Sequence, residues 1–94
     1  MRDSGGNTVG VRVRFFAAAA DAAGTDTATA QVARGMSVAD AAALAGGHSH
    51  ELQRVLAISS YLVGGLRVPG QKRLTDLSDL TNLTIDVVPP FAGG

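Results

Sequence analysis

The residues with the clearest chemistry stand at the end of the sequence, which reads Pro89-Pro90-Phe91-Ala92-Gly93-Gly94. The two prolines stiffen the chain and exclude helix. The two glycines carry no side chain, so their backbone can thread a narrow channel in another protein. We expect Gly94 to be the true end of the chain, and six extended residues reach roughly 20 Å. This pattern predicts an extended tail over residues 89–94 that enters a partner's site, with Gly94 as the reacting residue and Gly93 as its slender neighbour.

The reactive group of such a tail is the α-carboxylate of Gly94. A terminal carboxyl has an ordinary pKa of about 3.5, so near neutral pH it is ionised and a poor electrophile. Coupling it to AMP makes it reactive, and sulfide or a persulfide that displaces the AMP leaves a thiocarboxylate. The chain has no cysteine, which excludes disulfides, thiolate metal sites and a cysteine persulfide. A thiocarboxylate is a sulfur nucleophile that needs no cysteine, so the composition is compatible with sulfur transfer.

Two other segments invite a chemical interpretation. His48 and His50 are separated by one residue, but Glu51 is the only acidic or thiol ligand beside them, so we expect no metal site. The segment from Gly65 to Gly70 is similar to a phosphate-binding loop, but its lysine, Lys72, stands one place late and no Ser or Thr follows it. We therefore expect no bound cofactor and no active site within the domain; ATP would belong to a partner.

Residues that could contact a partner fall into a charged pair and an apolar set. Lys72 and Arg73 can meet an acidic patch on a partner, although a solvated loop pair has the same sequence. Phe16, Leu66, Val88 and Phe91 can form an apolar docking surface beside the tail, the alternative being that Phe16 and Leu66 belong to the core. The residues predicted to bind a partner are Val88, Pro89, Pro90, Phe91, Ala92, Lys72 and Arg73.

Composition narrows the class of protein. The 94 residues suffice for one domain, and 46% of them are hydrophobic. The formal net charge is zero and the chain has four aromatic residues, so we expect neither a phosphate-neutralising surface nor a base-stacking platform, and hence no nucleic-acid partner. The sequence has no apolar run long enough to span a membrane, and its polar beginning lacks the apolar core of a signal peptide. We expect a cytoplasmic protein.

The chain that positions the tail reads as alternating strands and helices. Val9, Val11, Val13 and Phe15 recur with a period of two, which is typical of a strand with one buried face. The predicted elements are strands at Val9 to Phe16, Thr27 to Val32, Ile58 to Val63, Leu66 to Val68 and Leu83 to Val88, helices at Ala17 to Ala23, Ser37 to Ala45 and His50 to Leu56, and a single turn at Leu74 to Leu80. The domain then spans residues 9–88, between a loose segment over residues 1–8 and the tail.

Local signals fix the clearest helix and hairpin. The Ser37 hydroxyl can accept the backbone N–H of Asp40, as in a capping box, and the helix should bury Val38, Ala41, Ala42 and Ala45 with Leu44 at the edge of that face. Gly64-Gly65 suits a tight hairpin in which both residues have positive φ. An initial strand pair, a helix that crosses a mixed sheet and a last strand predict an α+β fold of the β-grasp type, packed on one main helix. The alternative is a ferredoxin-like sandwich, which would need a stronger second helix.

The sequence resembles the MoaD/ThiS family of ubiquitin-like sulfur carriers over about Val9 to Gly94. The resemblance is carried by the opening VRVRFFAAAADAAGTD, by GMSVAD at the helix start and by the ending DVVPPFAGG. The ending Pro-Pro-x-Ala-Gly-Gly is more typical of the molybdopterin branch than of the thiamin branch. The resemblance implies a β-grasp fold and makes Gly94 the thiocarboxylate bearer.

The same resemblance implies partners and a cofactor used in trans. An E1-like adenylyltransferase similar to MoeB would adenylate Gly94 with ATP and Mg, and sulfur transfer to precursor Z would follow in the active site of a MoaE-like large subunit of molybdopterin synthase. Sulfur transfer for thiamin, cysteine or tRNA thiolation remains open. A ubiquitin-like modifier joined to lysines through Gly94, and a plain interaction domain with an inert tail, are alternatives from other classes.

Overall fold

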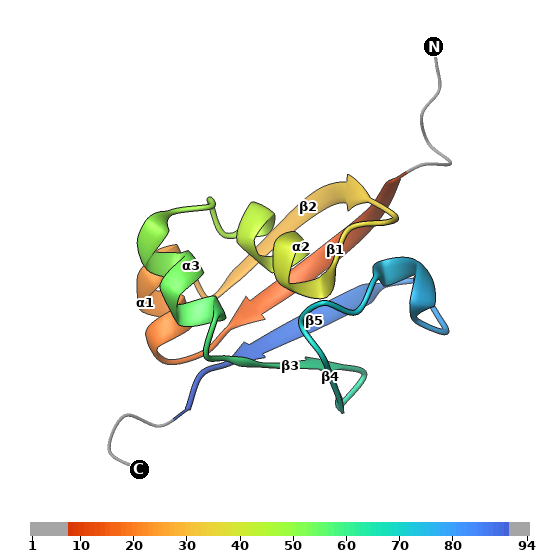
Figure 1. Ribbon diagram of the computed structural model, residues 1–94. Helices are drawn as coiled ribbons and strands as arrows, with labels where there is room; N and C mark the ends of the chain where they lie inside the picture. The colour runs from red at the N-terminus through yellow and green to blue at the C-terminus, as the bar shows by residue number, and fades with distance from the viewer. Residues whose placement is uncertain (1–7, 91–94) are drawn as a thin grey trace.

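The computed structural model describes residues 8–90, which form a five-stranded sheet and short helices in the predicted order (Figure 1). The elements are β1 (Thr8–Phe15), α1 (Ala18–Ala23), β2 (Thr27–Ala33), α2 (Val38–Ala45), α3 (His50–Leu56), β3 (Ser60–Val63), β4 (Leu66–Val68), the 3₁₀ helix η2 (Leu74–Asp76) and β5 (Leu83–Val88). The first strand begins one residue before the predicted boundary. Among the described residues, no helix is long and apolar enough to cross a membrane.

The sheet is mixed, with the strand order β2-β1-β5-β3-β4. The last strand, β5, lies at the centre, parallel to β1 and antiparallel to β3, while β2 and β4 form the edges as antiparallel partners of β1 and β3. In a ferredoxin-like sandwich the first two strands flank a crossover helix and run parallel. Because β1 and β2 are antiparallel neighbours, that alternative is wrong, and the β-grasp prediction is confirmed.

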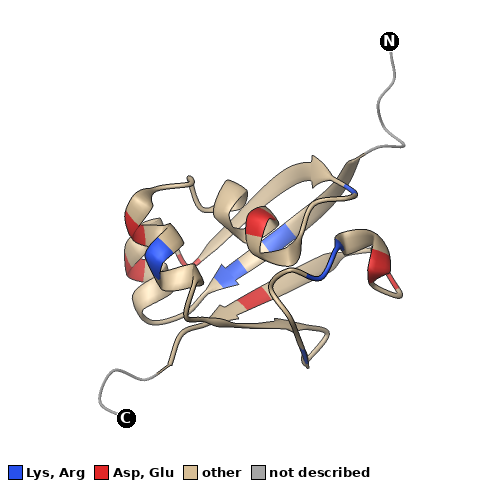
Figure 2. Ribbon diagram, viewed as in Figure 1, with Lys and Arg blue, Asp and Glu red and all other residues tan. Residues whose placement is uncertain are grey.

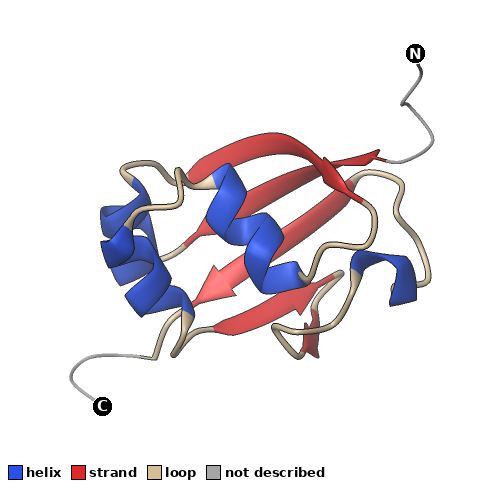
Figure 3. Cartoon of the chain, turned by 45° about the horizontal axis from the view of Figure 1, so that its top comes forward, coloured by secondary structure: helices blue, strands red, loops and turns tan. Residues whose placement is uncertain are grey.

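The core lies between the sheet and the helices, which occupy one face (Figure 3). The alternation along β1 and β5 is regular, so Val13, Ile85 and Val87 are completely buried while the intervening residues point to the opposite face. The helix α2 packs over β2 and β1, and α1 and α3 pack against each other at one end of the sheet. The face of the sheet opposite the helices is therefore available to a partner.

Polar caps begin the two longer helices. The Ser37 hydroxyl accepts a hydrogen bond of 3.1 Å from the backbone N–H of Asp40, as the sequence predicts, and Ser49 caps α3 in the same way through Leu52. The hairpin between β3 and β4 turns at Gly64 and Gly65, with φ angles of 61° and 82°. Two consecutive residues with positive φ are the requirement expected for this turn, so that prediction is confirmed.

Two details of the helical region differ from the prediction. The third strand begins at Ser60 rather than Ile58, because Ile58 donates its N–H to Val55 in the turn that ends α3 and is 66% exposed. On α2, Ala43 is buried and Ala45 only partly so. The predicted face took account of the sheet alone, whereas α3 also packs against α2 and covers the flank that carries Ala43.

Candidate functional site

The candidate site is the place where the chain leaves the sheet after β5. Val88 ends the strand and pairs with Ser60 of β3, while the preceding Val87 pairs with Phe15 of β1. The backbone therefore departs from the middle of the sheet, flanked on both sides (Figure 1). Pro89 is buried and Pro90 is exposed. Since proline cannot donate to a ladder, the two residues end the strand.

Three apolar side chains surround this exit on the face opposite the helices. We call Phe16, Leu62 and Val88 the exit patch. Alternation places Leu62 and Val88 on the open face, because their neighbours Tyr61 and Val87 are buried in the core. Phe16 follows β1, donates its backbone N–H to Val87 and remains 42% exposed. The patch thus joins three neighbouring strands around the start of the tail.

An ion pair between β1 and β5 lies beside the exit patch. The Arg14 guanidinium donates two hydrogen bonds, of 2.7 and 2.8 Å, to the carboxylate of Asp86 on the neighbouring strand. Its cationic carbon also lies 5.7 Å from the centre of the Phe16 ring, over the ring face. The hydrogen bond and the negative charge of Asp86 raise the pKa of Arg14 above its ordinary value. Figure 2 shows basic segments of β1 beside an acidic segment of β5. The Arg14 guanidinium thus contacts both Asp86 and the Phe16 ring.

The sequence analysis missed Arg14, Asp86 and Leu62. Alternation places Arg14 and Asp86 on the exposed faces of two predicted strands, but 72 positions separate them. Only the parallel pairing of β1 with β5 brings them opposite each other. Leu62 has no distinguishing pattern in the sequence, because it lies within a short apolar strand.

The charged pair predicted to bind a partner lies elsewhere. Lys72 lines a groove with Leu83 at the start of β5, whereas the tail leaves from the end of that strand. Arg73 donates a 2.7 Å hydrogen bond from its guanidinium to the Gly35 carbonyl and forms an isolated bridge with Ser37. The structure therefore does not bring Lys72 and Arg73 to the exit patch. Arg73 is also not a purely solvated side chain, because its guanidinium bonds with the Gly35 carbonyl. Their role in binding a partner stays a prediction.

The structure also decides the alternative that placed two apolar residues in the core. Phe16 is 42% exposed and Leu66 is 73% exposed, so that alternative is wrong for both. Leu66 begins β4 at the sheet edge and lines the same groove as Lys72, so it is not part of the exit patch. The predicted tail residues Phe91, Ala92, Gly93 and Gly94 lie outside the described residues.

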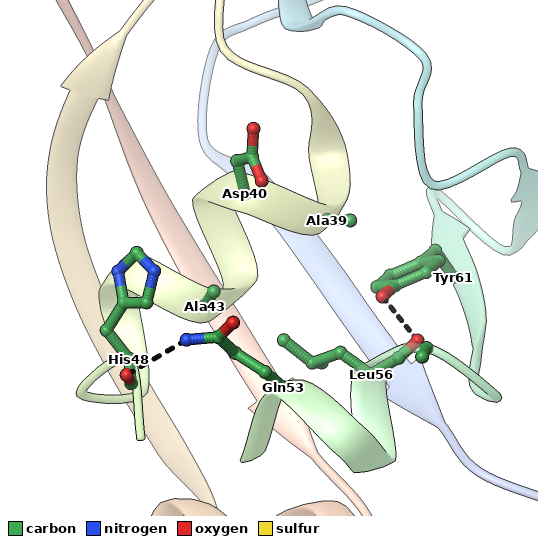
Figure 4. Close-up of a pocket in the computed structure, with 8 residues that line it drawn as sticks. Ala39, Asp40, Ala43, His48, Gln53, Leu56 and Tyr61 are labelled. Atoms are coloured by element: carbon green, nitrogen blue, oxygen red, sulfur yellow. Dashed lines mark hydrogen bonds between the residues drawn. The ribbon is translucent and has the colours of Figure 1, made fainter. Parts of the chain in front are cut away.

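A cleft between α2 and α3 is the other hollow of interest (Figure 4). It has a volume of about 210 Å³ and contains polar groups from His48, Gln53 and Tyr61. Gln53 donates to the His48 carbonyl, and the buried Tyr61 hydroxyl donates to the Leu56 carbonyl at 2.9 Å. These bonds tie α3 to its flanking segments. Across residues 8–90, no three side chains of His, Cys, Asp or Glu converge as metal ligands.

The environment of Tyr61 has one electrostatic consequence. Burial raises the pKa of the phenol, and the negative charge of Asp40 across the cleft adds to the effect. Tyr61 is therefore a neutral hydrogen-bond donor near neutral pH.

Comparison with solved structures identifies the architecture. The crystal structure of small archaeal modifier protein SAMP1 from Haloferax volcanii is similar with a TM-score of 0.67 and 21% identity, over 90% of this chain and 99% of that chain. A putative molybdopterin converting factor, subunit 1, from Pyrococcus furiosus has a TM-score of 0.62 and 24% identity, over 88% and 99%. The solution structure of HVO 2177 from Haloferax volcanii has a TM-score of 0.72 and 20% identity, over 100% and 94%.

The chain has the ubiquitin-like β-grasp fold. No protein-family model and no curated protein sequence matches it. The likeness therefore concerns three-dimensional structure. The match covers 99% of two neighbours, one described as SAMP1 and the other as a putative molybdopterin converting factor, subunit 1. In this β-grasp domain, the exit patch lies at the end of β5, next to Pro89.

Proposed function

We propose that the protein is a sulfur carrier of the MoaD type that carries its cargo on the carboxyl group of Gly94. The observation that carries the proposal is the placement of a Pro-Pro-Phe-Ala-Gly-Gly segment directly after the central strand of a β-grasp sheet. The neighbour described as a putative molybdopterin converting factor, subunit 1, supports molybdopterin synthesis as the pathway. Thiamin, cysteine and tRNA thiolation use the same carrier chemistry.

The chemistry takes place in partners, and the chain supplies the acyl group. An E1-like, MoeB-like enzyme with ATP and Mg would convert the Gly94 carboxylate to an acyl adenylate and release pyrophosphate. Sulfide then attacks the acyl carbon, and AMP leaves as the thiocarboxylate forms. A persulfide donor would instead give an acyl disulfide and AMP, and a thiol of the donor enzyme would then cleave the S–S bond, releasing the thiocarboxylate and leaving a disulfide on the enzyme. A MoaE-like synthase subunit would accept the tail, and the sulfur would pass to precursor Z in its active site. The proposed location for these steps is the cytoplasm.

The exit patch is the proposed docking surface for both partners. Phe16, Leu62 and Val88 present apolar area immediately beside the point at which the tail departs. The Arg14–Asp86 hydrogen bonds beside the patch are already formed in the free protein. Less side-chain freedom is therefore lost when a partner binds. A partner that covers the patch also receives the tail, so docking and insertion are coupled through Val88 and the two prolines.

Intact mass measurement tests the proposal directly. The purified chain is incubated with the E1-like enzyme, ATP, Mg and a sulfur donor, and the expected product has one oxygen replaced by sulfur at Gly94. The untreated mass also verifies that the chain ends at Gly94. Deletion of Gly94 should abolish the exchange and leave the fold unchanged, and Leu66→Ala, which lies off the patch, should leave the exchange intact. An unchanged mass with active enzyme present would contradict the proposal.

A second candidate is a ubiquitin-like modifier, which the similarity to small archaeal modifier proteins favours. In that function, Gly94 forms an isopeptide bond with a lysine of another protein. The chain has one lysine of its own, Lys72, so a polymer joined through lysines would use that residue. Conjugates of higher mass that persist under denaturing conditions and disappear on deletion of Gly94 support the modifier. A thiocarboxylate without conjugates supports the carrier.

A further inference from the structure

The open edge of β2 differs from the protected edges common in small sheets. Native edge strands are usually interrupted by lysine, proline or a bulge. The seven residues of β2 read Thr-Ala-Thr-Ala-Gln-Val-Ala and contain neither charge nor proline. The Gln31 side chain contacts the side-chain hydroxyl of Thr8 and lies over Gly10, so it extends back across β1 rather than shielding its own strand edge.

The hydrogen-bond pattern locates the unpaired groups. Phe15 donates to the carbonyl of Asp26, so alternation makes Ala28, Ala30 and Val32 bond with β1 and turns the intervening residues outward. The outward groups at both ends of β2 are already occupied: Thr27 bonds with the Thr25 hydroxyl, and the Ala33 carbonyl accepts from Met36. Within residues 8–90, the N–H and C=O groups of Thr29 and Gln31 have no such partner.

We propose that a second copy of this chain pairs with this edge, antiparallel, about a two-fold axis through Ala30. In that register Thr29 of each copy lies opposite Gln31 of the other, and the two pairs exchange four main-chain hydrogen bonds. If the register shifts by two residues in one direction, Gln31 lies opposite Thr27; if it shifts in the other direction, Thr29 lies opposite Ala33. In both cases an open residue faces one whose outward carbonyl already accepts a hydrogen bond. The occupied groups therefore favour the register that pairs the N–H and C=O groups of Thr29 with those of Gln31.

Charge supports the same register. Pairing about Ala30 places Asp26 of one copy opposite Arg34 of the other, twice by symmetry. Both residues are exposed, and the ion pair found among the described residues joins Arg14 to Asp86 instead. Asp26 and Arg34 lie just beyond opposite ends of the seven-residue strand β2, so they do not pair within a monomer. Opposite charges meet only between copies.

An exposed apolar residue lies on the same side of the molecule. Leu44 of α2 is 43% exposed. Successive helical residues turn by about 100°, and Ala39 and Ala43 face the cleft that contains Tyr61. Leu44 is thereby directed away from that cleft, and the helix that carries it packs over β2. In the paired sheet the two α2 helices approach each other across the axis, and the exit patches, at the strands β1, β5 and β3, remain open.

Complementary charge reversals test this arrangement. In Asp26→Arg, an arginine at position 26 of each copy faces Arg34 of the other, and in Arg34→Asp, an aspartate at position 34 of each copy faces Asp26 of the other. Each variant should therefore self-associate about ten-fold or more weakly than wild type. Mixing the two variants restores both opposite-charge pairs in a mixed dimer, and the double variant restores them in a homodimer. Sedimentation equilibrium over a range of concentrations measures the masses, and circular dichroism verifies that each variant is folded.

The main-chain bonds are tested separately. Thr29→Pro removes an outward N–H that the β1–β2 ladder does not use, so it should weaken the dimer and preserve the monomer, whereas Thr29→Val keeps the N–H and should dimerise. A mixture of Asp26→Arg and Arg34→Asp that remains monomeric while both chains are folded overturns the proposal. Wild type that stays monomeric at every concentration overturns it as well, even where the edge binds an extended strand of another protein. The inference does not depend on Gly94, so it stands or falls apart from the proposed function.

Discussion

Replacing Phe16 with alanine should weaken binding to the E1-like enzyme by about 30-fold. Phe16 is 42% exposed in the free protein. A phenylalanine offers about 200 Å² in full, so about 80 Å² of its surface remains for a partner to cover. At about 25 cal/mol per Å², covering that surface contributes about 2 kcal/mol, which corresponds to about 30-fold in Kd. The value is within the range measured for aromatic residues at the centre of interfaces.

Isothermal titration calorimetry with the activating enzyme measures this change, and the control is Leu66→Ala. Leu66 is also apolar and is more exposed, at 73%, but it lies at the edge strand, away from the exit. The control variant should bind like wild type. Thermal unfolding of both variants separates loss of affinity from loss of fold. If Phe16→Ala binds as tightly as wild type while Leu66→Ala binds weakly, the partner covers the β4 edge and the assignment of the exit patch is wrong.

Three further predictions concern the fold that supports the site. Gly46→Ala should lower the free energy of unfolding by about 1–3 kcal/mol in urea, because its Cβ would lie 2.5 Å from Leu52 Cδ2 and 2.9 Å from the Phe15 ring. Gly35→Ala is the control, because its Cβ meets nothing within 4 Å. Ser37→Ala should cost about 1 kcal/mol through loss of the helix cap, and Ser37→Thr should retain most of it. Burial raises the pKa of Tyr61 in the folded protein. The stability that the neutral phenol contributes is therefore complete below the ordinary pKa of about 10 and is lost as the pH rises through the higher folded pKa. Tyr61→Phe should flatten this alkaline decrease in the free energy of unfolding, measured as a function of pH.

Local rules account for the part of the fold that the sequence predicts. The alternation from Val9 to Phe15 marks β1 because one face is buried and the other is not. The cap at Ser37 depends on a residue three places away, and the turn at Gly64 and Gly65 depends on the φ angles of those residues alone. Each of these features is settled within a few residues of chain, so no knowledge of the tertiary structure is needed to find it.

The candidate site depends on pairings that sequence does not state. Arg14 meets Asp86 only because β5 inserts beside β1, and that choice of neighbour is made by the whole sheet. The same pairing exposes Phe16, which an apolar pattern alone would place in the core as readily as on the surface. Arg73 lies far from the exit because its guanidinium bonds with the Gly35 carbonyl, a contact between loops. Predicting these positions requires the topology first.

The central position of β5 explains how one small domain can both fold and present a tail. A tail that followed an edge strand would leave one side of its base without a neighbour, and the base would move with the edge. Here Val87 lies between Phe15 of β1 and Tyr61 of β3, and Val88 still pairs with Ser60 of β3, so the end of β5 has a neighbour on each side up to Val87. All the helices cover the opposite face, so a partner can cover Phe16, Leu62 and Val88 without disturbing a packed helix. The fold thus separates the face that packs against the helices from the open face beside the end of β5.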